Sequence, residues 1–252
     1  MWAGAGASGL ARRKASCGAR RRPLLFALAL LLGAASVSAQ SLQRLEVQFK
    51  RTTASADGLQ MIEGTLYFLA PDQVIIVVSK PVLQWSVFRG KDLLIYYPQE
   101  RKAFRFISRN RLLIPFARSF IGLVREDFGL AEAGFSLKEH RRQAGLLMTV
   151  WSAPQRIRRL ISRAVVGSDG GRPVLLELYD PKNRLVARTT YSSYFQQGPI
   201  LLPGRSTAFQ VTPNGELREE FFYFNHRVNE PLPSEVEDFR VPDSVEVQEL
   251  AW

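Results

Sequence analysis

Apolar and polar residues alternate with a period of two through most of the chain from Leu42 onward. In the first such stretch Leu45, Val47 and Phe49 are separated by charged or polar residues. This period is typical of β-strands, whose side chains point alternately to the two faces of a sheet. Turn residues such as Asp57-Gly58 interrupt the alternation between residues 42 and 108. This region therefore predicts a meander of about six antiparallel strands.

The same period returns after residue 134. It predicts further strands over 135–140, 146–151, 157–166, 174–179, 185–194, 206–212, 217–225 and 245–250. Hairpin signals separate several of them, and a Pro/Gly-rich stretch predicts a loop over Gln197–Arg205. About a dozen strands in one sheet must curl or close, because flat open sheets of that width are unusual. The pattern predicts a mainly β protein with little helix.

One segment has helical spacing instead. Pro115 suits the first position of a helix, and apolar residues follow it at intervals of three and four, opposite two arginines. The apolar positions are Phe116, Phe120, Leu123 and Val124. The sequence predicts one short amphipathic helix over Pro115–Asp127.

Several of the predicted strands are apolar on both faces. The segments 66–69, 74–78 and 221–224 contain hardly any polar position. A sheet with one face in water would alternate more cleanly. Two interpretations remain open from composition: a core that fills itself, or an apolar cavity inside a curled sheet with the predicted helix as its lid and an acyl chain as its ligand.

The first 39 residues have the pattern of a secretory signal. Basic residues end at Arg22, a short apolar segment covers Leu24–Ala35, and Val37-Ser38-Ala39 provides an A-x-A-like cleavage site. The apolar segment is short against the roughly 20 residues that span a bilayer. We expect residues 1–39 to be removed, which leaves 40–252 as one exported domain.

Charge and cysteine content narrow the functional classes. Six of the 34 basic residues and none of the 23 acidic residues lie in the first 39 positions, so the remainder is only mildly basic. No Lys/Arg tract or nucleic-acid motif is present, and nucleic acid is excluded as a partner. The single cysteine, Cys17, precedes the predicted cleavage site, which leaves the exported domain without a disulfide or a lipid-bearing cysteine.

No catalytic or metal-binding motif is found. His140 and His226 lie in separate segments without ligand spacing, so each is interpreted as a surface or packing residue. Neither a nucleophile-elbow motif nor a zinc-peptidase motif occurs, and the paired acids at Glu219-Glu220 are explained by strand ends and turns. We expect a protein that is not an enzyme and that needs no cofactor or metal.

The order of several short motifs resembles the LolA/LolB-like lipoprotein carriers. The residues that carry the resemblance are the Gly64–Leu69 strand, the Ala70-Pro71 turn, the Val74–Val78 strand, the Lys80-Pro81 break, the Arg89–Lys91 turn, Leu94–Pro98, Pro115-Phe116, Asp180–Asn183 and the Phe239-x-Val-Pro segment. They span most of the chain after residue 39. The arginine that the carriers place before the turn proline corresponds here to Ala70.

The resemblance implies an incomplete antiparallel barrel covered by short helices, with a cavity that receives lipoprotein acyl chains. The cavity-lining positions that it implies are Val74, Ile76 and Val78, closed by Phe116, Phe120 and Leu123 of the covering helix; pattern alone adds Leu66, Phe68, Leu83, Trp85 and Val87. It implies a monomeric periplasmic carrier that works between an inner-membrane loading complex and an outer-membrane acceptor.

Two other functions remain open at this stage. The first is a non-catalytic envelope sensor or interaction module on the same fold, which could dock a partner through an exposed apolar loop at Ile200-Leu201-Leu202. The second is a structural envelope protein whose core is packed and has no cavity.

Overall fold

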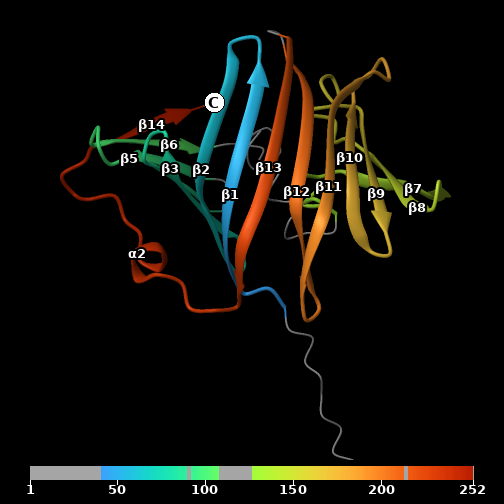
Figure 1. The fold of residues 1–252 in the computed structure, drawn as a ribbon. Coiled ribbons are helices and arrows are strands. Elements are labelled where there is room, and N and C mark those ends of the chain that lie inside the picture. The colour runs from blue at the N-terminus through green and yellow to red at the C-terminus, as the bar shows by residue number, and fades with distance from the viewer. Residues whose placement is uncertain (1–40, 90–91, 108–126, 213–214, 252) are drawn as a thin grey trace, which may run out of the picture. The chain divides into compact units, whose positions relative to one another are not determined.

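The computed structural model describes residues 41–89, 92–107, 127–212 and 215–251. Fourteen strands in this part of the chain form one sheet in the order β14-β6-β5-β4-β3-β2-β1-β13-β12-β11-β10-β9-β8-β7. The sheet is curled and open, with β14 and β7 as its edges (Figure 1). The predicted leader, 1–39, and all of the predicted helix except Asp127 lie outside the described residues.

The first six strands form the meander that the alternation predicts. They are β1 (Arg44–Ser55), β2 (Gly58–Leu69), β3 (Gln73–Lys80), β4 (Gln84–Arg89), β5 (Asp92–Tyr97) and β6 (Lys102–Ile107). Each pairs antiparallel with the next, and the Asp57-Gly58 signal makes the β1–β2 hairpin, where Ser55 opposes Gly58. Gly58 has a φ of 114°, which its missing Cβ permits.

The second half of the sheet adds seven antiparallel strands. They are β7 (Ser136–Gln143), β8 (Leu146–Ser152), β9 (Arg163–Asp169), β10 (Arg172–Tyr179), β11 (Leu185–Gln197), β12 (Ile200–Thr212) and β13 (Gly215–Val228). Strand β13 pairs with β1, which joins the two halves into one sheet. The long strands β2, β1, β13, β12 and β11 stand side by side at its centre (Figure 1).

Two predicted boundaries in this half are wrong. The strand predicted over 157–166 begins only at Arg163, because residues 155–160 form turns that bury Ile157. The loop predicted over Gln197–Arg205 is mostly β12, since Ile200 already pairs with Gln197. The strand accommodates Pro203 and Gly204 because the ladder is irregular here: Ser193, which lies opposite, has a φ of 55°. Gly204 is required, since a Cβ at this position would lie 2.4 Å from the carbonyl oxygen of Ser193.

The last strand departs from the antiparallel pattern. Strand β14 (Val247–Ala251) pairs parallel with β6. Before it, residues 229–246, which we name the C-terminal strap, include the four-residue helix α2 (Ser234–Glu237). The strap leads the chain from β13 to the edge of the sheet at β6, so β14 reaches β6 as a distant segment of the chain and not through a hairpin, which would make the pair antiparallel.

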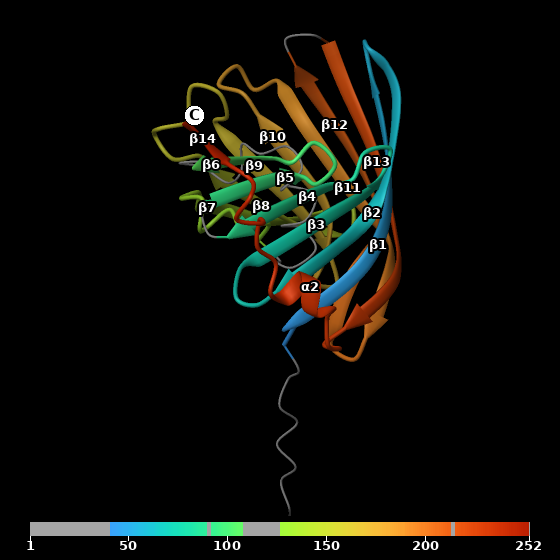
Figure 2. The ribbon, with the colours of Figure 1, turned by 90° about the vertical axis from the view of Figure 1, so that its left-hand side faces the viewer.

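Strands β2–β5 bury apolar side chains on both of their faces. On the concave face Leu66, Phe68 and Ile76 join a cluster with Phe49 and Phe221. The intervening residues face outward into a second cluster, which the C-terminal strap completes. The second cluster contains Tyr67, Ile75 and Val87 of the sheet together with Leu232 and Val236 of the strap. The double apolar pattern of these strands thus reflects a sheet covered on its outer face (Figure 2).

A separate cluster forms on strands β8–β11. Phe128, Leu130, Phe135 and Ile157 from the connections on either side of β7 and β8 pack against the buried side chains of these strands. Tyr191 extends this cluster and contacts the Phe128 ring at 5.2 Å between centroids. Both halves of the sheet are therefore held by their own apolar contacts as well as by the backbone ladder.

Candidate functional site

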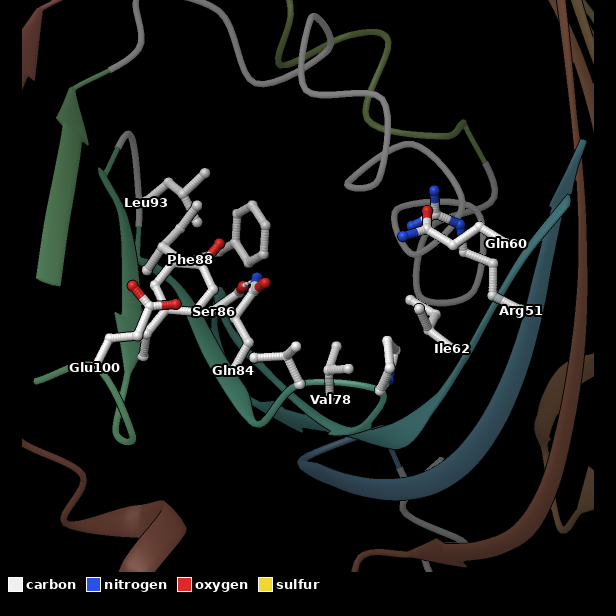
Figure 3. A pocket seen from close by; sticks show the side chains of 13 residues that line it. Arg51, Gln60, Ile62, Val78, Gln84, Ser86, Phe88, Leu93 and Glu100 are labelled. Carbon is white, nitrogen blue, oxygen red and sulfur yellow. Dashed lines mark hydrogen bonds between the residues drawn. The ribbon is translucent and has the colours of Figure 1, made fainter. Parts of the chain in front are cut away.

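A pocket of about 510 Å³ opens on the concave face of strands β1–β5. The side chains drawn in Figure 3 point from these strands into the space that the curl encloses. Its lining residues are Arg51, Gln60, Ile62, Val78, Pro81, Val82, Gln84, Ser86, Phe88, Leu93, Ile95, Tyr97 and Glu100. The period-two geometry of the strands explains this set, since residues two apart on one strand share a face.

The floor of the pocket is apolar. Ile62, Val78 and Phe88 contact the concave core cluster, and Leu93 and Ile95 form a smaller cluster with Phe88. The floor is therefore the exposed margin of the core, with no layer of polar residues between them. Such a surface favours a hydrocarbon ligand, because apolar area removed from water contributes about 25 cal/mol per Å².

The walls of the pocket carry hydrogen-bonding groups. On one side Arg51 lies near Gln60, and on the other Gln84 and Ser86 face them across Ile62 and Val78 (Figure 3). The Gln84 amide donates a hydrogen bond to Ser86 Oγ at 2.8 Å. These polar groups would lie beside the polar end of an amphiphilic ligand.

Arg51 forms an ion pair at the edge of the pocket. Its Nη2 lies 2.7 Å from Glu219 Oε1, and its Nε donates to Thr53 Oγ1 at 2.9 Å. The Arg51 side chain is 20% exposed and that of Glu219 only 8%. The guanidinium also lies 5.8 Å from the centre of the Phe221 ring, which holds it between the core and the pocket.

The structure places Trp85 and Val87 on the opposite face from the one that the sequence analysis predicts. Val87 belongs to the outer cluster, and the Trp85 ring stacks on Phe239 of the C-terminal strap at 4.6 Å. The polar residues Gln84 and Ser86 of the same strand face the pocket instead. The inversion has a physical cause: the strap covers the outer face of β4, so Trp85 and Val87 are buried there, while Phe88 at the end of the strand faces the pocket.

The other predicted positions divide into three groups. Val78 lines the pocket. Four others lie on the same face of the sheet as Val78 but pack into the concave core cluster: Leu66, Phe68, Val74 and Ile76. Leu66 and Ile76 are at most 2% exposed. Leu83 is half-buried just before β4 and does not line the pocket, while Phe116, Phe120 and Leu123 lie outside the described residues.

Sequence reasoning missed most of the lining residues. Leu93, Ile95 and Tyr97 alternate visibly on β5, but nothing in the sequence indicates which face of that strand is concave. Arg51 and Gln84 resemble the solvent-facing residues of any alternating strand. One signal could have indicated them. The residues of β3 and β4 that alternate with the lining residues are unusually apolar, so they must be covered by another part of the chain, which marks their face as the outer one.

Within the described ranges, no group of three or more His, Cys, Asp or Glu side chains is arranged to hold a metal ion. In the same part of the chain, no helix has the length and apolar character needed to cross a membrane.

His226 lies on the concave side of the sheet and packs against an aromatic side chain. Its ring stacks on Phe195 at 4.5 Å, and burial lowers its pKa below the ordinary value of 6.5. A depressed pKa means that the unfolded chain binds the proton more readily, so stability from the neutral ring is lost as pH falls below 6.5. We expect the melting temperature to fall between about pH 7 and pH 5, and the His226→Phe variant to lose part of that dependence.

A matched variant separates this effect from general acid sensitivity. His140 is exposed on the edge strand β7, so His140→Gln should keep the dependence of the original chain. The carboxylates of Glu63 and Asp180, whose pKa values are lowered by Lys80 and by the Arg184 backbone respectively, lose their contribution only below about pH 4.5. Equal pH profiles for His226→Phe and the original chain between pH 7 and pH 5 would contradict the assignment.

Several solved structures share this fold. A DUF1329 family protein from Desulfovibrio piger is 18% identical, with a TM-score of 0.57 over 78% of this chain and 90% of that one. A LolA superfamily protein from Nitrosomonas europaea is 15% identical, with a TM-score of 0.55 over 77% and 90%. A domain assigned to outer membrane lipoprotein sorting, from Vibrio parahaemolyticus, is 15% identical, with a TM-score of 0.56 over 77% and 88%.

No protein-family model and no curated protein sequence matches the chain. The structural likeness confirms the predicted LolA-like fold, a large curled antiparallel sheet that does not close into a barrel. At these identities the likeness concerns the fold alone.

Proposed function

We propose that this protein is a periplasmic carrier that binds acyl chains of lipoproteins or other lipids in its concave pocket and moves them toward the outer membrane. The observation that carries the proposal is the apolar pocket on the inner face of a LolA-like sheet. Its volume of about 510 Å³ lies within the range of roughly 300–1,000 Å³ that is usual for small-molecule sites.

The physical need for such a carrier is simple. Each methylene group kept from water contributes about 0.8 kcal/mol, so a lipid with several chains does not cross an aqueous compartment unaided. A pocket whose floor is the margin of the core lowers that cost without a cofactor or a covalent step. Direction would then come from partners, an inner-membrane complex that loads the carrier and an outer-membrane acceptor that empties it.

The sequence supports the location that this function requires. The pattern of residues 1–39 is that of an export signal, and the chain after Ala39 contains no cysteine to carry a lipid anchor. We therefore infer a shuttle that is free in the periplasm and acts as a monomer. Its action would be reversible binding, without catalysis.

The two alternatives have less support. Docking through Ile200-Leu201-Leu202 needs an exposed loop, but these residues begin β12, and Leu202 is 1% exposed in the concave core cluster. A structural protein with a filled core has no use for a pocket of this volume. The position of the pocket therefore favours the carrier.

Lipid transfer between vesicles tests the proposal. Donor vesicles carry a self-quenched fluorescent acyl lipid and acceptor vesicles carry none, so fluorescence rises as lipid moves between them. We expect the full chain to raise the transfer rate in proportion to its concentration, because each protein molecule carries its own load. A transfer rate that does not change with protein concentration would contradict the carrier function.

A further inference from the structure

The polar walls of the pocket indicate more than an acyl chain. Two pairs of polar side chains face each other across the apolar floor (Figure 3). One pair is Arg51 and Gln60, and the other is Gln84 and Ser86. Polar groups placed against pure hydrocarbon lose their hydrogen bonds to water and gain nothing in return. An occupant that suits this pocket therefore has a hydrogen-bonding group at one end of its apolar chain.

The charges around the pocket indicate which kind of polar group this is. Arg51 is already neutralised by Glu219, whose carboxylate lies 2.7 Å from its Nη2 and is almost fully buried. Glu100 lines the pocket opposite, and its exposed carboxylate pairs with Lys102 Nζ at 3.2 Å. Among the described lining residues both charged side chains thus already have a partner of opposite charge, and an incoming carboxylate would have to compete with Glu219 for Arg51. Bringing like charges together in a partly desolvated site is costly, whereas an uncharged carbonyl or hydroxyl avoids that cost.

We propose that the pocket selects acyl chains attached through an uncharged ester or amide and rejects chains that end in an ionised carboxylate. This inference rests on the function proposed above. Glu219 is the specificity-determining residue, because it removes the positive charge that would otherwise bind a fatty-acid carboxylate. Arg51 then acts as a hydrogen-bonding wall of the pocket. Glycerolipids and lipid-modified polypeptides both offer this uncharged linkage.

Competition binding with two matched lipids tests the proposal. The neutral dye N-phenyl-1-naphthylamine is bound to the full chain and displaced by monolaurin or by laurate, which share one acyl chain and differ in the charge of the head. At about pH 8 the laurate carboxyl is ionised. We expect monolaurin to displace the dye at a concentration about tenfold lower than laurate does.

Two variants of equal charge change locate the cause. In Glu219→Gln the amide can still accept a hydrogen bond from Arg51, but the cation is no longer neutralised, so laurate should bind about tenfold more tightly and the preference should vanish or reverse. Glu220→Gln is the matched control, because Glu220 is the next residue on β13, lies on the other face of the sheet and pairs with Arg205. It should leave the preference unchanged.

A third variant keeps the test decisive if Glu219→Gln does not fold. Glu100 is exposed at the rim, and Glu100→Gln should strengthen laurate binding several-fold while monolaurin binding stays constant. Equal binding of the two lipids by the original chain, or an unchanged preference in both Glu219→Gln and Glu100→Gln, would overturn the selectivity. Failure of both lipids to displace the dye would instead count against the carrier function itself.

A diacylated synthetic peptide and a diacylglycerol, tested in the same competition, distinguish the two sources of the uncharged linkage. Stronger displacement by the lipopeptide assigns the pocket to lipoprotein cargo, and stronger displacement by the diacylglycerol assigns it to membrane lipid. Weaker binding of both than of laurate would overturn the proposal.

Discussion

Replacing Phe221 with alanine is expected to lower the free energy of unfolding by about 3–5 kcal/mol. Phe221 has no exposed surface and joins β13 to β1 in the concave core cluster. Its ring stacks on Tyr223 at 5.7 Å and lies 6.3 Å from the Phe49 ring. Loss of the ring leaves a cavity where the two halves of the sheet meet, and the rigid strands around it can close the cavity only in part.

Urea unfolding followed by circular dichroism measures this effect, and the neighbouring residue supplies the control. Phe222 is 42% exposed on the opposite face, where the Arg205 guanidinium lies 5.0 Å from its ring centre. Phe222→Ala should cost less than about 1 kcal/mol, since little buried area is lost. Similar losses for the two variants would contradict the assignment of Phe221 to the inner face.

Replacing Ile62 with aspartate is expected to weaken acyl-chain binding at least tenfold, about 1.4 kcal/mol or more. Ile62 is half-buried on the pocket floor, where its side chain contacts the margin of the core. In the empty pocket water can still hydrate the new carboxylate, so the fold should survive. An acyl chain would expel that water and leave the charge against hydrocarbon, which is strongly unfavourable.

The control for this variant is the preceding residue. Met61 is 59% exposed on the outer face of β2, so Met61→Asp adds the same charge one position away without touching the pocket. Its affinity for N-phenyl-1-naphthylamine and for monolaurin should equal that of the original chain. Equal loss of binding in both variants would show that charge on β2, and not the pocket, governs binding.

The strands of this protein could be predicted from its sequence because they depend on local alternation and turn chemistry. The six-strand meander and the Asp180–Asn183 turn follow from such signals, and Asn183 indeed takes a positive φ of 62°. The parallel pairing of β14 with β6 could not be predicted. It depends on where the C-terminal strap travels, and no local pattern records that path.

The faces of the strands were harder to predict than the strands themselves. In β4 an alternating pattern places either Gln84 and Ser86 or Trp85 and Val87 on the concave side. The usual rule, apolar side inward, fails here because Phe239 and the rest of the C-terminal strap give the outer face its own core. The ion pair between Arg51 and Glu219 was equally hidden, since it joins two strands 168 positions apart in the chain.

Mass spectrometry of the lipids that accompany the protein from its native envelope shows whether the concave pocket holds acyl chains. Protein purified without detergent is extracted with organic solvent, and the acyl lipid recovered per protein molecule is quantified for the original chain and for Met61→Asp and Ile62→Asp. We expect about one acyl lipid per protein molecule in the original chain and in Met61→Asp, and its loss in Ile62→Asp. Protein that carries no lipid, and that takes up none when an acyl lipid is supplied, would contradict this expectation.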